Sequence, residues 1–248
     1  MMRLLLFAVL ACFASIEARP AELVSGLSTD IVQITSSFAG TELTIFGAVD
    51  TPRTSGADLV VVVRGPALDM TVRRKERILG IWVNREQVAF SGLPGYYFLA
   101  STRPLDAIAT PATLQRFRLG AANLNAAAKT PIPAIEAAEL RAAIVRDRTR
   151  AYLYSEAPSG IEFLSPTLFR ARVPLPASVP PGEYRAEVYL FQGGTAAGAQ
   201  STPLSIDKSG FERTVYNLAY RDSLLYGLAT VLMSIVLGWA GYFLFRQS

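Results

Sequence analysis

The sequence predicts a mainly β protein in which a two-sheet β-sandwich, carrying a two-helix insertion, is followed by a single transmembrane helix. Three observations point to this fold class. Short segments rich in β-branched and aromatic residues recur between glycine- and proline-containing turns in both halves of the chain. Residues 110–149 instead repeat their apolar positions at helical spacing. Residues 224–245 are apolar and contain no charged side chain.

The N-terminal residues 1–18 have the layout of a secretory signal peptide. Arg3 supplies the positive charge, and the apolar run 4–14 is too short to cross about 30 Å of hydrocarbon. Ala18 fits the position before a cleavage site. The alternatives are a buried N-terminal helix, although the run has no amphipathic spacing, and a lipoprotein signal that would leave a lipid on Cys12. A cleaved signal places the rest of the chain in the periplasm.

The first half of the body is strand-like. Residues 59–63 form a continuous β-branched run, which is typical of a strand buried on both faces. The neighbouring segments alternate apolar and polar residues and end at turn-forming residues. The predicted strands are residues 30–36, 41–49, 59–63, 71–77, 80–84, 87–90 and 96–100.

The helical insertion begins at a clear capping signal. Thr110 is a good N-cap, and Pro111 suits the first helical position. A second helix is expected over residues 134–148, where basic residues in the last turn complement the helix dipole. The insertion therefore spans residues 110–149.

The strand pattern returns after the insertion. Residues 168–173 and 184–190 alternate, a proline-rich turn separates them, and a weaker edge strand is expected near 202–206. This layout is common at the closing hairpin of immunoglobulin-like sandwiches. We therefore expect an immunoglobulin-like β-sandwich over residues 19–206.

The C-terminal part is expected to enter the membrane. Residues 207–222 predict an amphipathic juxtamembrane helix, residues 223–245 a transmembrane helix, and residues 246–248 a cytoplasmic tail. The alternative for the apolar segment is a central helix of a large core. The signal peptide fixes the expected orientation: a single-pass protein of the bacterial inner membrane with a cytoplasmic C-terminus.

Small residues recur along one side of this apolar helix. In a bilayer, close backbone approach through small residues is the usual basis of helix association. They predict a packing stripe toward an integral membrane protein or a second copy of the chain. The alternative is that such residues are simply common in membrane helices. The stripe consists of Gly227, Thr230, Ser234, Gly238 and Gly241.

Composition excludes several chemistries. The chain has no histidine and one cysteine, which removes Ser-His-Asp catalysis, histidine or cysteine metal sites and internal disulfides. The formal charge of +4 at pH 7 is spread thinly and is no nucleic-acid footprint. Carboxylate pairs, Asp69 with Glu76 and Glu183 with Glu187, leave a carboxylate-based hydrolase as a weak alternative. We expect no catalytic residue, no cofactor and no bound metal.

The densest polar cluster is a basic hairpin. Its five basic residues suit an oxyanion, a lipid headgroup or an acidic partner, whereas the simpler interpretation is a solvated hairpin with an ordinary charged face. The cluster consists of Arg73, Arg74, Lys75, Arg77 and Arg85.

Four stretches together resemble one known family. They are residues 60–66 (VVVVRGP), 73–85 (RRKERILGIWVNR) and 168–193, and the run from Lys208 to Glu212 that leads toward Leu225-Tyr226-Gly227. The chain resembles the alphaproteobacterial putative transmembrane protein family (Alph_Pro_TM) over nearly its whole mature length. The resemblance implies a periplasmic domain with one C-terminal helix, and some relatives in the family are encoded beside sulfite-exporter-like permeases. It implies no catalytic residue.

The sequence thus predicts a membrane-anchored periplasmic interaction or accessory domain that assists a membrane protein such as a sulfite-exporter-like permease, rather than an enzyme. The alternative is an oxyanion- or lipid-binding module that uses the basic hairpin.

Overall fold

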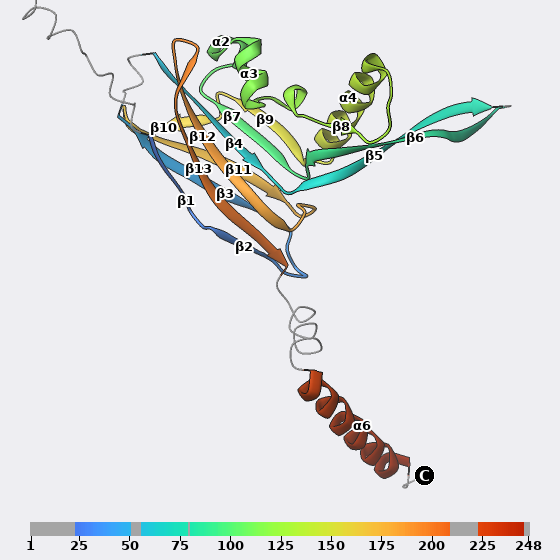
Figure 1. Ribbon diagram of the computed structural model, residues 1–248. Helices are drawn as coiled ribbons and strands as arrows, with labels where there is room; N and C mark the ends of the chain where they lie inside the picture. Colours follow the sequence, from blue (N-terminus) through green and yellow to red (C-terminus); the bar gives the residue numbers. More distant parts are fainter. Residues whose placement is uncertain (1–22, 51–55, 79, 209–222, 246–248) are drawn as a thin grey trace, which may run out of the picture.

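The computed structural model describes residues 23–50, 56–78, 80–208 and 223–245 (Figure 1). The predicted signal peptide at 1–18, residues 209–222 of the predicted juxtamembrane helix and the tail at 246–248 lie outside the described residues. Residues 207 and 208, assigned to that helix from the sequence, instead end the last strand.

The structure confirms a mainly β chain with several sheets. The four-stranded sheet is antiparallel throughout, in the order β1 (Leu23–Leu27), β3 (Gly40–Val49), β11 (Leu168–Pro176), β10 (Ile161–Phe163). The six-stranded sheet has the order β2 (Ile31–Ile34), β13 (Thr195–Lys208), β12 (Gly182–Gln192), β4 (Ala57–Arg64), β7 (Tyr97–Ser101), β9 (Tyr154–Pro158). Its two outer pairs, β2 with β13 and β7 with β9, are parallel.

One core joins the two sheets. Alternate residues of β3 and β11 are buried, as are alternate residues of β12, so that each strand turns one face inward. Strand β4 is buried along almost its whole length, as the continuous run at 59–63 predicts. It lies between β12 and β7 and is covered on both sides.

The approach between β1, β3 and β11 requires a glycine. Gly47 of β3 pairs with Ser25 of β1 and Phe169 of β11. A Cβ atom at Gly47 would lie 2.3 Å from the carbonyl oxygen of Val24 and 2.7 Å from Cζ of Phe169. The side chain of Phe169 therefore fills the space that any other residue would need.

Helical segments cover the outer face of the six-stranded sheet (Figure 1). They are α2 (Leu105–Ile108), α3 (Pro111–Phe117), the 3-10 helix Ala121–Asn123 and α4 (Ala134–Arg150). Both predicted helices are present, and Thr110 caps α3 through the N–H of Thr113. The ring of Phe117 packs against Tyr189 and Phe191 of β12, with centroids 5.4 and 6.3 Å apart.

The sequence divided one long hairpin into three short strands. The structure instead has β5 (Ala67–Ile78) and β6 (Ile81–Pro94), which pair along their length and turn at Gly80, where φ is +88°. A third strand, β8 (Ala127–Ala128), pairs only with Phe90 and Ser91 at the base. The hairpin extends away from the sandwich as an arm (Figure 1).

The expected fold class needs a correction at its C-terminal transmembrane helix. A helix is present, α6 (Ser223–Phe245). Within the described residues, however, no helix combines the length and the hydropathy that a membrane crossing needs. The prediction rested on the charge-free length of residues 224–245, a run in which glycine and hydroxyl-bearing residues are interspersed among the apolar ones.

Candidate functional site

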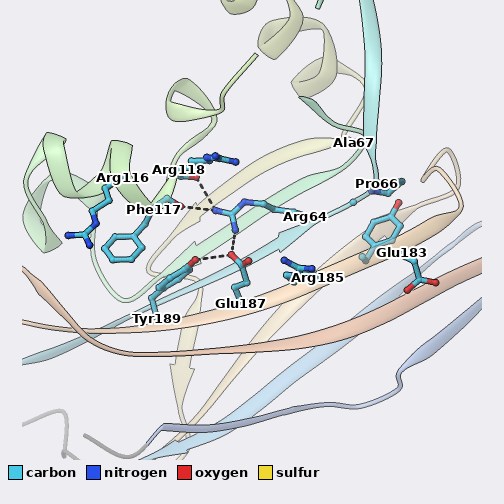
Figure 2. Close-up of a pocket in the computed structure, with 12 residues that line it drawn as sticks. Arg64, Pro66, Ala67, Arg116, Phe117, Arg118, Glu183, Arg185, Glu187 and Tyr189 are labelled. Atoms are coloured by element: carbon cyan, nitrogen blue, oxygen red, sulfur yellow. Dashed lines mark hydrogen bonds and ion pairs between the residues drawn. The ribbon is translucent and has the colours of Figure 1, made fainter. Parts of the chain in front are cut away.

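A cavity of about 630 Å³ opens where the C-terminal end of α3 meets β4 and β12 (Figure 2). We call it the arginine cavity because four guanidinium groups line it. Its walls combine these with two glutamates, aromatic rings and a short turn after β4. The lining residues are Arg64, Gly65, Pro66, Ala67, Arg116, Phe117, Arg118, Glu183, Tyr184, Arg185, Glu187 and Tyr189.

The strand pleat explains why polar side chains meet here. On β12 the even-numbered residues from 184 to 190 are buried, and the odd-numbered residues lie on the opposite face. Arg185, Glu187 and Tyr189 therefore project together toward the helices. Arg64, the last residue of β4, lies beside them. Helix α3 ends at Phe117, and Arg118 adopts a left-handed conformation with φ of 54°.

Arg64 holds α3 against the sheet. Its Nη1 forms an ion pair with Glu187, and its Nη2 donates to the backbone carbonyls of Phe117 and Arg118 at 3.0 and 3.1 Å. Those carbonyls lie at the C-terminal end of α3, where a positive charge is favourable. The hydroxyl of Tyr189 donates to the same Glu187 carboxylate at 2.9 Å. Glu187 is thus committed to two partners within the cavity wall (Figure 2).

The other guanidinium groups have no such partners. Arg116, Arg118 and Arg185 form no ion pair with any residue that the structure describes, and all three are exposed. The guanidinium carbon of Arg116 lies 5.6 Å from the ring centroid of Phe117. Arg185 is the direct cross-strand neighbour of Arg64. Like charges placed opposite one another in a sheet are destabilising unless something compensates them.

Tyr184, one of the two tyrosines in the cavity wall, stays neutral. Burial raises the pKa of Tyr184, and its hydroxyl donates to the carbonyl of Pro180. Glu183 is exposed and accepts a long hydrogen bond, 3.4 Å, from the hydroxyl of Ser205. The arrangement is therefore suited to binding an anion.

Three of the four carboxylates in the pairs predicted from the sequence are described, and each has a partner of its own. Glu183 and Glu187 both reach the arginine cavity, but Glu187 is occupied by Arg64 and Tyr189. Asp69 forms an ion pair with Lys129 at 2.6 Å. The side chain of Glu76 lies outside the described residues.

The basic residues predicted as a contact site lie on the β5–β6 arm, away from the arginine cavity. Arg73 and Arg77 are exposed, and Nε of Arg77 donates to the carbonyl of Gly80 at 3.3 Å. The backbone register places Arg74 opposite Glu86, with an irregularity between Arg74 and Lys75. Nothing is described of the side chains of Arg74, Lys75 and Arg85.

The predicted small-residue stripe lies on α6. The hydroxyl of Ser234 donates to the carbonyl of Thr230 at 2.8 Å, and that of Thr230 donates to the carbonyl of Tyr226. A Cβ atom at Gly227 or Gly238 would meet open space. Gly241 falls within the helix, in the part where only the backbone is described.

Within residues 23–50, 56–78, 80–208 and 223–245, no group of three or more cysteine, aspartate or glutamate side chains could hold a metal ion.

The arginine cavity was not predicted from the sequence. Its basic residues come from the end of β4, the end of α3 and the distant strand β12. They therefore form no local cluster in the sequence. Two features of the sequence could have indicated it. Arg64 follows directly after the apolar run 59–63, and charged residues alternate with uncharged ones over residues 183–187.

One family model, described as putative transmembrane protein (Alph_Pro_TM), matches residues 22–247, and the resemblance drawn from the sequence is thereby confirmed. The comparison with curated proteins found no match.

Proposed function

This chain belongs to the Alph_Pro_TM family of putative transmembrane proteins, and on that basis we propose that it is a membrane-associated interaction domain on the periplasmic side that assists an integral membrane protein. The family description supports the membrane association. The signal-peptide layout of residues 1–18 supports the periplasmic location. A permease, such as a sulfite-exporter-like one, is the partner class that the family resemblance implies. The role is binding rather than catalysis.

The observation that carries this proposal is the β5–β6 arm. Strands β5 and β6 pair with each other over most of their length, and within the described part of the chain a third strand joins them only at Phe90 and Ser91. A two-stranded ribbon is marginally stable by itself in water. The outer part of the arm therefore gains stability when a partner covers it.

The chemistry of the arm indicates the kind of partner. Arg73 and Arg77 are exposed on β5, and Ile81 beside the turn is 68% exposed. Exposed arginines along β5, together with an exposed aliphatic side chain at the turn, suit an acidic protein surface with an apolar patch. We assign that surface to the partner membrane protein.

An anionic lipid surface is the second candidate. Basic side chains around an exposed aliphatic residue also suit the headgroup boundary of a bilayer, where the apolar side chain enters and the charges meet anionic lipid. This is the lipid-binding form of the alternative that the basic hairpin suggests from the sequence.

Charge reversal on the arm separates these candidates. We expect Arg73→Glu with Arg77→Glu to lower recovery of a stoichiometric integral membrane partner at least tenfold, in affinity purification of the full chain in mild detergent. The thermal midpoint should stay nearly unchanged, because exposed charges contribute within about 0.5 kcal/mol. Arg146→Glu with Arg150→Glu, on the exposed side of α4, is the matched control and should recover the partner normally.

Undiminished partner recovery with the reversed arm would contradict the partner proposal. In parallel, sedimentation with phosphatidylglycerol and phosphatidylcholine vesicles tests the second candidate. If charge reversal lowers only the binding to phosphatidylglycerol vesicles, the lipid surface and not a protein is the partner of the arm.

A further inference from the structure

The arginine cavity carries an inference that is independent of the arm, because the two share no arginine. Four arginines and two glutamates line it. The cavity itself therefore holds a surplus of two positive charges. Such a surplus at one concave place is unfavourable unless an anion neutralises it.

The unpaired positive charge nearest the β4–β12 strand pair belongs to Arg185. Arg64 and Arg185 stand directly opposite one another in the β4–β12 register, which places their Cβ atoms about 5 Å apart. Glu187 neutralises Arg64. Arg185 is left beside this pair with no carboxylate partner among the described residues (Figure 2).

A second donor at the same place is unused. Nε of Arg64 is buried and has no hydrogen-bond partner within the part of the chain that the structure describes. A buried donor without an acceptor costs free energy, so each such group calls for an explanation. Because Nε has almost no accessible surface, an oxyanion held by Arg185 accepts from it only after a shift of the Arg64 side chain.

We propose that the arginine cavity binds a phosphate monoester. A phosphate monoester carries about −1.5 to −2 charges at pH 7, which matches the surplus, whereas a carboxylate supplies only one. Its oxygens accept the paired N–H groups of guanidinium ions. The roughly 630 Å³ of the cavity exceeds the need of a bare oxyanion. The organic part of the ester packs against Phe117, Tyr189 and Pro66.

Exposed Arg116 and Arg118 complete the site at the end of α3. They raise the local concentration of anions. The phosphate monoester can belong to a soluble molecule or to a phosphatidic acid headgroup. The chemistry at the arginines is the same in both, and the test separates the two sources.

The test is isothermal titration of the full chain in detergent with glycerol 3-phosphate, and with glycerol, sodium acetate and sodium sulfate as comparison ligands. We expect binding of glycerol 3-phosphate, no binding of glycerol, and at least tenfold weaker binding of acetate. Arg185→Gln should weaken glycerol 3-phosphate binding at least tenfold. Arg172→Gln, an exposed arginine on β11, is the matched control and should leave binding unchanged.

Three outcomes would overturn the proposal: no heat from glycerol 3-phosphate at millimolar concentration, equal binding by Arg185→Gln, or equal affinity for acetate. Sulfate binding as tight as that of the ester would overturn the role of the organic part. Thermal midpoints of both variants confirm that they are folded. Nanodiscs with and without phosphatidic acid decide the source, because a lipid headgroup would compete with glycerol 3-phosphate for the cavity.

Discussion

Gly47→Ala is expected to destabilise the protein by about 3 kcal/mol, because it overpacks the place where three strands meet. The new methyl group would lie 2.3 Å from a backbone oxygen of β1 and 2.7 Å from the ring of Phe169. The ring is fully buried, so it cannot swing into solvent. The strand pair β1–β3 must separate, or the ring must move into a filled core.

The measurement is chemical denaturation of the full chain in detergent, with thermal unfolding as a second readout. A loss of 3 kcal/mol corresponds to a fall of roughly 6–12 °C in the midpoint for a domain of this size. Gly26→Ala is the matched control in the neighbouring strand. Its nearest contact, 3.4 Å to the ring of Phe46, is a side chain that can adjust. Equal stability of the two variants would show that β1 does not lie against Gly47 as described.

Glu187→Ala is expected to cost about 2 kcal/mol, because it leaves Arg64 without its carboxylate partner. The side chains of Arg64 and Glu187 are only 19% and 17% exposed, so water replaces the lost partner poorly. The value lies below that of a fully buried pair because some solvent still reaches both groups. Removal of the carboxylate also leaves Arg64 facing Arg185 across the strand pair.

A double-mutant cycle checks this assignment. The double variant Arg64→Gln with Glu187→Gln should lose less stability than the sum of the losses of the two single variants, since neither side chain is then left as an unpaired charge. Glu162→Ala removes the partner of Arg170 at an exposed site and should have a much smaller effect on unfolding. A loss at Glu187 no larger than that at Glu162 would contradict the description of this pair as an anchor for α3.

The fold could be predicted where local pattern and tertiary structure agree. Residues 59–63 are apolar at every position, and the strand they form is covered on both faces. Thr110 and Pro111 mark the start of α3 because capping is a local interaction. The long β5–β6 arm was divided because its charged residues and Gly80 are turn and surface signals. Strand pairing overrides such signals, and the pairing register cannot be predicted from the sequence of one strand alone.

The arginine cavity could not be predicted for a related reason. Its central pair, Arg64 and Arg185, lies on neighbouring strands that are distant in sequence, and only the β4–β12 register brings the two together. The cavity also depends on where α3 ends, because Arg64 donates to the carbonyl groups of Phe117 and Arg118 at that end. The basic hairpin stood out in the sequence because four of its five basic residues fall within residues 73–77. A search for basic residues that are close in sequence therefore detects the residues of the arm and misses those of the cavity.

The parallel pairing of β2 with β13 has a mechanical consequence. On one side, the last residues of β13, from Ser205 to Lys208, pair with β2. On its other side, β13 pairs with the whole length of β12. Hydrogen bonds between strands run across the strand direction. Traction applied at Lys208 along β13 therefore shears many bonds at once, whereas peeling breaks them singly. A domain tethered beyond Lys208 would resist pulling along this strand far better than pulling across it.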